Sequence, residues 1–101
     1  MLNIRLGRGY DQLYRNLIQN DSELKDRIIA LINLFEKNPN DTRLSNHALT
    51  KKMKGKWAFS ITDDIRIVYE WISQTTVCFL AIGPHNKVYP RKVIKKQSPK
   101  R

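Results

Sequence analysis

The sequence predicts an α+β domain in which an N-terminal strand and a two-helix hairpin precede an antiparallel sheet meander. Apolar residues recur with helical spacing between residues 10 and 35, and from residue 57 onward they alternate with polar ones as in strands. The connections between the later strands are short, which favours antiparallel pairing. A chain of 101 residues with 41% hydrophobic residues can bury one core, so we expect a single domain.

The first forty residues predict one strand and two helices. Residues 2–6 alternate apolar and polar side chains, which is typical of a half-buried strand. Residues 10–18 and residues 24–35 each place their apolar side chains on one helical face. Asn20 is the expected cap of the second helix, which is expected to end before Pro39. The short joint between the helices predicts an antiparallel hairpin that packs on the sheet.

The second half of the chain predicts the sheet. Alternation over residues 57–62 and 65–71 indicates two strands joined by a tight turn. The continuous apolar run of residues 77–82 predicts a strand covered on both faces. Residues 44–49 are compatible with a loop or with a short strand. Residues 88–94 are compatible with a fifth edge strand or with a short terminal helix.

The charge of the chain is strongly positive and unevenly distributed. It carries 19 Lys and Arg against 9 Asp and Glu, and residues 51–101 hold 12 of the basic residues and 3 of the acidic ones. Such a concentrated positive field indicates a polyanionic partner, either a nucleic acid or an acidic protein; a solvated basic tail is the alternative. We expect one domain over residues 1–95 and a basic C-terminal tail over residues 96–101.

Several classes of function are disfavoured by what the sequence lacks. It contains no Walker loop, no glycine-rich dinucleotide fingerprint and no His-Glu-x-x-His motif, so no cofactor is expected. The single cysteine, Cys78, and the two histidines do not form a metal-ligand pattern, so no metal is expected. No apolar run is long enough to span a membrane. Together with the lone cysteine, this predicts a cytoplasmic protein.

A polar set in the second half remains as the candidate site: His47, Lys51, Lys52, Lys54, Lys56, Asp64, Arg66, His85, Lys87 and Tyr89. Arg66 is unexpected because it interrupts an otherwise apolar strand; a solvated, outward-facing arginine is the alternative. A histidine can transfer a proton near neutral pH, and an arginine can stabilise charge on a phosphate. Because RNA supplies its own nucleophile, the 2′-hydroxyl, this set is sufficient for RNA cleavage without a metal.

Several short motifs follow one another in an order that resembles a known family. They are Leu44-x-x-His47-x-Leu49, Gly55 with Trp57, Asp64-Ile65-Arg66-Ile67-Val68-Tyr69, Ile82-Gly83-x-His85-x-x-x-Tyr89, and the helical segment from Ser22 to Pro39. In this order and spacing they resemble the RelE/ParE superfamily of type II toxins, and most of all its YafQ-like branch of ribosome-dependent mRNA interferases.

The resemblance implies two helices packed on a twisted antiparallel sheet, and cleavage of mRNA in the ribosomal A site. The positions that match YafQ-like catalytic residues are His47, Asp64, His85 and Tyr89. Arg66 matches the strand arginine with which RelE stabilises the phosphate. His85 is then the expected acid for the 5′-oxygen leaving group, and His47 or Asp64 the expected base for the 2′-hydroxyl. Tyr89 is expected to position the nucleotide.

The resemblance also implies partners. Family members are neutralised by an antitoxin encoded alongside them, so the expected partners are a cognate antitoxin, mRNA and the ribosome. The residues expected to bind RNA or the ribosome are Lys51, Lys52, Lys54, Lys56, Lys87 and Arg91. The lysines of residues 51–56 are alternatively part of the active site, as in RelE.

The chain departs from the YafQ-like pattern on the strand after Gly55. An acidic residue and a histidine of that pattern are replaced here by Ala58 and Ser60, which leaves fewer groups for proton transfer. Three alternatives to a ribonuclease therefore stay open. They are a ParE-like poison of DNA gyrase, a generic basic RNA-binding protein, and a degenerate toxin that only binds its antitoxin.

Overall fold

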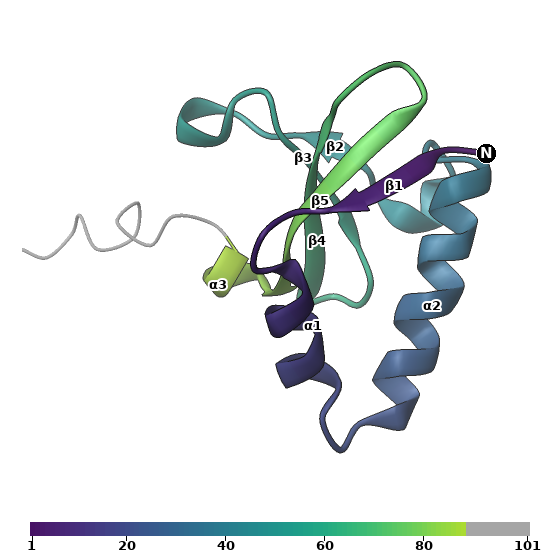
Figure 1. Cartoon of the computed structure of the whole chain (residues 1–101), viewed down its shortest axis with the longest axis vertical. Helices are drawn as coiled ribbons and strands as arrows, with labels where there is room; N and C mark the ends of the chain where they lie inside the picture. The colour runs from purple at the N-terminus through teal and green to yellow at the C-terminus, as the bar shows by residue number, and fades with distance from the viewer. Residues whose placement is uncertain (89–101) are drawn as a thin grey trace, which may run out of the picture.

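A computed structural model describes residues 1–88 and shows a five-stranded sheet with two main helices (Figure 1). The strands are β1 (Asn3–Leu6), β2 (His47–Ala48), β3 (Trp57–Ser60), β4 (Ile65–Trp71) and β5 (Thr76–Pro84). The helices are α1 (Tyr10–Ile18), α2 (Ser22–Lys37) and the short α3 (His85–Val88), with single-turn 3-10 helices η1 (Thr42–Leu44) and η2 (Lys51–Met53). The α+β fold class is confirmed. The predicted end of the domain at residue 95 and the basic tail lie outside the described residues.

The helical hairpin lies where the sequence predicted it, but the cap of α2 is one residue later. The Asp21 carboxylate, and not Asn20, accepts the Leu24 N–H at 3.0 Å. Asn20 instead adopts a left-handed backbone conformation, with φ 63°, in the joint between the helices. Asparagine tolerates this conformation better than most residues, so Asn20 makes the turn and Asp21 does the capping.

The strands are ordered β1-β5-β4-β3-β2. Strands β3 to β5 pair antiparallel, as their short connections predicted, and β2 pairs antiparallel with β3. Strand β1 pairs parallel with β5, with Asn3 opposite Thr76 and Leu6 opposite Phe79, so the sheet is mixed. The sequence pattern assigned β1 no partner, because this pairing joins distant parts of the chain and its direction depends on where the helical hairpin leads.

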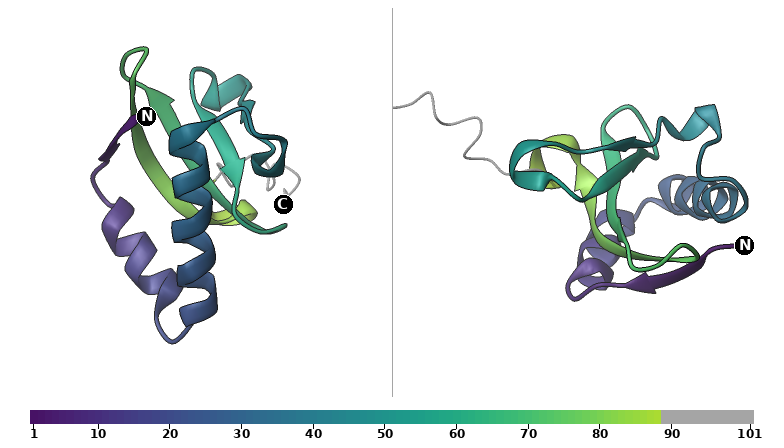
Figure 2. Two further views of the ribbon diagram at one scale, coloured as in Figure 1. Left: turned by 90° about the vertical axis from the view of Figure 1, so that its right-hand side faces the viewer. Right: turned by 90° about the horizontal axis from the view of Figure 1, so that it is seen from above.

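The face of the sheet under α1 and α2 holds the core (Figure 2). Phe35 of α2 and Phe59, Tyr69 and Phe79 of three neighbouring strands are fully buried. Phe35 stacks on Phe59 with ring centroids 4.4 Å apart and meets Tyr69 edge-on at 4.9 Å. Aromatic rings in this arrangement contribute attraction beyond the area they bury. This cluster therefore holds α2 against β3, β4 and β5.

The opposite face of the sheet carries small and polar side chains. The pairing register aligns two adjacent rows on this face, His47–Ala58–Val68–Ala81 and Ser60–Arg66–Gly83. Residues that pair directly in antiparallel strands project to the same face, and so do residues two apart along one strand. Ala58 and Val68 are buried, whereas the polar members lie toward the sheet edge and the β3–β4 turn. The polar members of these two rows thus lie toward one end of this face.

The structure resolves the segments that the sequence left open. Residues 44–49 contain the end of η1 and the short strand β2, and Val88 is the last residue of α3. The rest of residues 88–94 lies outside the described residues. In residues 77–82, Val77, Phe79 and Ile82 are buried and the other three residues are half-buried, so coverage on both faces is only partial. Among the helices of residues 1–88, none has the length and apolar composition of a membrane span.

Candidate functional site

An open cavity of about 320 Å³ lies at the edge of the sheet beside the β3–β4 turn. Its lining is Arg27, Arg43, Ser45, His47, Ser60, Ile61, Thr62, Asp63 and Arg66. Two of the predicted site residues, His47 and Arg66, therefore meet in one cavity, as the register of β2, β3 and β4 requires. Three arginines against one aspartate make the lining positive, which suits an anionic ligand.

Arg66 is half-buried, and its guanidinium is held by the turn that precedes its own strand. Nη1 donates to the Thr62 carbonyl at 2.9 Å and to the Asp63 carbonyl at 2.7 Å. Within residues 1–88 no carboxylate lies within salt-bridge distance of it. The arginine that interrupts the apolar strand thus keeps its charge uncompensated in the cavity, where a phosphate could neutralise it.

His47 is exposed on β2, and its ring orientation is fixed locally. Nδ1 lies 2.9 Å from the Ser45 carbonyl oxygen. Because a carbonyl oxygen can only accept, this contact assigns the proton of the neutral ring to Nδ1. Nε2 is then left with its lone pair and can accept a proton, which is the requirement for a general base.

Asp64 and His85 lie together next to the cavity but do not line it. The His85 N–H donates to the Asp64 carbonyl at 2.8 Å and so ties the start of α3 to the β3–β4 turn. Both side chains are exposed. Arg66 pairs with Gly83, two residues before His85, so the same end of β4 and β5 carries all three predicted residues. Tyr89 and Arg91 lie outside the described residues.

The predicted RNA-binding lysines lie at the other end of β3. Lys51, Lys52 and Lys54 are exposed and Lys56 is half-buried, in the connection that contains η2. This connection leads into the first residue of β3, whereas the cavity lies at its last residue. The placement of these lysines fits a contact with a large partner better than a role in the cavity. Lys87 lies in α3.

Sequence reasoning missed two arginines of the cavity. Arg43 donates from Nε and Nη2 to the Asp41 carboxylate at 2.9 and 2.8 Å, and this ion pair lowers the pKa of Asp41 to about 2. The Asp-x-Arg spacing is a local signal that could have indicated the pair. Arg27 is an exposed residue of α2 whose Nε donates to the Ile61 carbonyl. No local pattern marks Arg27, because only the packing of α2 brings it to the turn.

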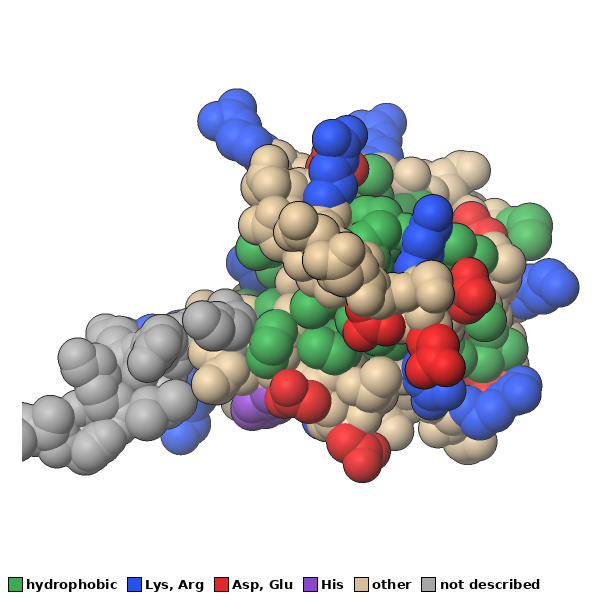
Figure 3. Space-filling view, turned by 90° about the horizontal axis from the view of Figure 1, so that it is seen from below, with side chains coloured by type: hydrophobic (Ala, Val, Ile, Leu, Met, Phe, Trp, Pro, Cys, Tyr) green, Lys and Arg blue, Asp and Glu red, His purple; other side chains and the backbone are tan. Residues whose placement is uncertain are grey.

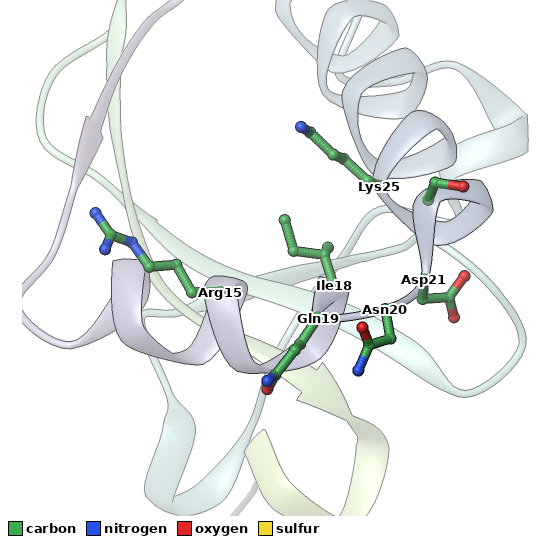
Figure 4. Close-up of a pocket in the computed structure, with 7 residues that line it drawn as sticks. Arg15, Ile18, Gln19, Asn20, Asp21 and Lys25 are labelled. Carbon is green, nitrogen blue, oxygen red and sulfur yellow. The ribbon is translucent and has the colours of Figure 1, made fainter.

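The rest of the surface is electrostatically mixed. Residues 1–88 hold 13 basic and 9 acidic residues, a smaller excess than the whole chain carries. On the lower face, acidic and basic side chains intermingle around exposed hydrophobic ones (Figure 3). A second depression at the α1–α2 joint is lined by Arg15, Asp21 and Lys25 among others, with Ile18 between the two helices (Figure 4). It contains no predicted site residue.

The fold of the chain resembles those of several solved proteins. No protein-family model and no curated protein sequence matches the chain. Solved structures do match. A copper-bound mutant toxin from Helicobacter pylori is 25% identical, with a TM-score of 0.67 over 88% of this chain and 100% of that one. YafQ from E. coli strain BL21(DE3) is 16% identical, with a TM-score of 0.73 over 89% of this chain and 100% of that one.

A third match comes from the E. coli DinJ-YafQ toxin-antitoxin complex, at 18% identity and a TM-score of 0.71 over 88% of this chain and 98% of that one. These matches extend over nearly the whole of each solved chain, so they compare complete folds and not a shared fragment. The resemblance to the RelE/ParE superfamily seen in the sequence is confirmed at the level of the fold, which the chain shares with YafQ and YoeB/ParE toxins.

Proposed function

We propose that the chain is the toxin of a type II toxin-antitoxin system and that it cleaves mRNA as a metal-independent endoribonuclease. The observation that carries the proposal is the shared cavity of His47 and Arg66. It combines a proton acceptor with an uncompensated cation, which are the two groups that attack by a 2′-hydroxyl requires. The solved relatives, which are described as toxins, support the biological role.

The reaction needs no group beyond the RNA and these side chains. Nε2 of His47 takes the proton of the 2′-hydroxyl, with the Asp64 carboxylate as the alternative base. The 2′-oxygen then bonds to the adjacent phosphorus, and Arg66 stabilises the added negative charge. The bond to the 5′-oxygen breaks, and His85 gives that oxygen a proton. The products are a 2′,3′-cyclic phosphate and a 5′-hydroxyl end.

The two departures from the YafQ-like pattern have different consequences in the structure. Ala58 is fully buried between its partners His47 and Val68, so an ionised side chain at this position would lack water. Ser60 lines the cavity opposite Arg66 and offers a hydroxyl to a ligand, but it does not exchange a proton readily at neutral pH. Cleavage therefore depends on the histidines and Asp64.

The proposed partners follow from charge and from the relatives. The DinJ-YafQ structure is that of a toxin-antitoxin complex, and a chain with net charge +10 is suited to a partly acidic antitoxin. The exposed lysines of residues 51–54 are proposed to contact ribosomal RNA, so that cleavage occurs on translating ribosomes. Co-expression with the adjacent small reading frame should yield a complex on co-purification.

The test is primer extension on a reporter message after induction of wild type and His85→Ala, with Arg15→Ala as a matched exposed control. We expect new cleavage ends with wild type and with the control, and strongly reduced ends with His85→Ala. Intact transcripts in every strain would contradict the proposal. If intact transcripts were accompanied by an induced DNA-damage response, a gyrase poison would be the better description.

A further inference from the structure

The cavity extends past the predicted catalytic residues to α2, where Arg27 lines it. Arg27 and Arg66 come from different elements, yet both are anchored on the same short turn. Arg27 donates from Nε to the Ile61 carbonyl, and Arg66 donates from Nη1 to the carbonyls of Thr62 and Asp63. Three consecutive carbonyls therefore hold two guanidinium groups at one cavity.

The charges of the three cavity arginines are not equivalent. Arg43 is paired through two hydrogen bonds with the Asp41 carboxylate, so its charge is compensated. In the described part of the chain, Arg27 and Arg66 have no carboxylate within salt-bridge distance. Asp63 is the one acidic residue of the lining. Two uncompensated cations beside one cavity repel each other, and an anion bound between them would relieve that repulsion.

The anchoring leaves the right atoms available for such an anion. Each guanidinium has five N–H donors in a planar fork that matches two oxygens of a phosphate. Arg27 donates to the turn through Nε alone, so its two terminal nitrogens have no protein partner among residues 1–88. Because the hydrogen bond to the turn already restricts the side chain, less conformational entropy is lost when a ligand binds.

We propose that Arg27 binds a backbone phosphate of the RNA next to the phosphate that Arg66 stabilises. This inference rests on the proposed ribonuclease function and adds a positioning residue to it. The RNA strand would cross the edge of the sheet beside the end of β3. There β2 pairs only with Trp57 and Ala58, and Ser60 lines the cavity. Arg27 contacts the RNA backbone and not the reacting atoms.

The first experiment measures binding of a single-stranded RNA oligonucleotide that is 2′-O-methylated throughout and cannot be cleaved. The full chain is compared with Arg27→Gln, Arg27→Lys and the control Arg15→Gln, which removes an equal charge from an exposed residue of α1. We expect Arg27→Gln to bind about tenfold more weakly than the control, with the slope of log Kd against log salt reduced by about one. Arg27→Lys, which keeps the charge but loses the fork, should fall between them.

The second experiment measures cleavage of the unmethylated RNA. Arg27→Gln should raise KM about tenfold and change kcat less than threefold, because a positioning contact is made equally in the ground state and the transition state. Equal binding by Arg27→Gln and Arg15→Gln would overturn the inference, and so would a wild type that binds no RNA or a loss confined to kcat. If Arg27→Gln does not fold, Arg27→Lys is compared with Arg15→Gln in its place. Weaker RNA binding by Arg27→Lys then supports the inference, and equal binding overturns it.

The two experiments separate this inference from the proposed function. A wild type that binds the methylated RNA but cleaves no RNA would end the ribonuclease proposal. The binding ratio between Arg27→Gln and Arg15→Gln would still decide the role of Arg27. Thermal melting of each variant confirms that its binding is measured on folded protein.

Discussion

The two faces of the sheet are made by the same strands and have opposite contents. Toward α1 and α2, Phe59, Tyr69 and Phe79 are fully buried and pack around Phe35. The other face carries Ala58 and Val68, and beside them the row Ser60–Arg66–Gly83, which leads to the cavity. Because strand residues alternate between faces, one step along β3 or β4 separates a core residue from a site residue.

The contrast between the two faces separates the residues that stabilise this small domain from those of the candidate site. The core under the helices contains most of the buried hydrophobic residues, so the other face can keep an uncompensated arginine and an exposed imidazole. A substitution on the aromatic face should therefore change stability and leave the chemistry intact, and a substitution at the cavity should do the reverse. The five predictions below test that separation, in order of decreasing effect.

Phe35→Ala should be the most destabilising change on the aromatic face. Removing a fully buried ring that contacts Phe59, Tyr69 and Phe79 should lower the free energy of unfolding by about 3–5 kcal/mol. Urea denaturation followed by circular dichroism measures it. RNA cleavage per folded molecule should stay near that of wild type. A loss below about 1 kcal/mol would show that the cluster does not hold α2 on the sheet.

Arg66→Ala should be the most damaging change at the cavity. Removing one group that stabilises charge in the transition state typically lowers the rate a hundred- to a thousandfold, or by about 2.7–4 kcal/mol. The cleavage rate on translated message measures it, with folding checked by thermal melting. Full cleavage activity in this variant would remove Arg66 from the proposed mechanism and separate the positive cavity from catalysis.

Tyr69→Phe tests a contact between the aromatic face and the segment that leads to His47. The Tyr69 hydroxyl donates to Asn46 Oδ1 at 2.8 Å, and Asn46 Nδ2 donates to the Pro39 carbonyl at 3.1 Å, which fixes the segment just before His47. Loss of the hydroxyl should cost about 1 kcal/mol of stability. It should also lower cleavage modestly, because His47 loses its support. Unchanged cleavage would show that His47 is positioned by β2 alone.

The same tyrosine predicts an alkaline limit of stability. Burial raises the pKa of Tyr69 to about 12. In the unfolded chain the phenol ionises near its ordinary pKa of about 10, so the stabilisation is complete below that pH and is lost as pH rises toward 12. Urea denaturation at pH 7 and pH 11 should show a smaller loss for Tyr69→Phe than for wild type. An equal loss would assign the alkaline limit to other groups, such as the buried Tyr10.

Arg15→Ala should have the smallest effect. The Arg15–Asp11 ion pair spans 2.8 Å on the exposed side of α1, away from both the aromatic cluster and the cavity. Exposed pairs of this spacing contribute about 0.3–0.5 kcal/mol. Neither the urea midpoint nor the cleavage rate should change noticeably. A clear loss of RNA binding here would mean that charge alone, and not the cavity, governs the interaction.

Particular residues show where prediction from the sequence succeeded and where it failed. The helix over residues 10–18 and the strand that begins at Trp57 were predicted from their periodicity, because the period of a helix or strand is a local property of the chain. That strand was expected over residues 57–62 and ends at Ser60. The cap of α2 was placed one residue early because Asn20 and Asp21 are both good capping residues, and only the geometry of the joint chooses between them. His47 and Arg66 were both proposed for the site, and they do share a cavity.

The α+β class, the helical hairpin and the polar residues available for chemistry follow from the order of the amino acids alone, because hydrophobic periodicity and side-chain type are local properties. The parallel pairing of β1 with β5 and the presence of Arg27 of α2 at the cavity of Arg66 become visible only in the folded chain. Both depend on how the hairpin packs against the sheet. That packing joins segments far apart in the sequence through contacts that no local pattern encodes.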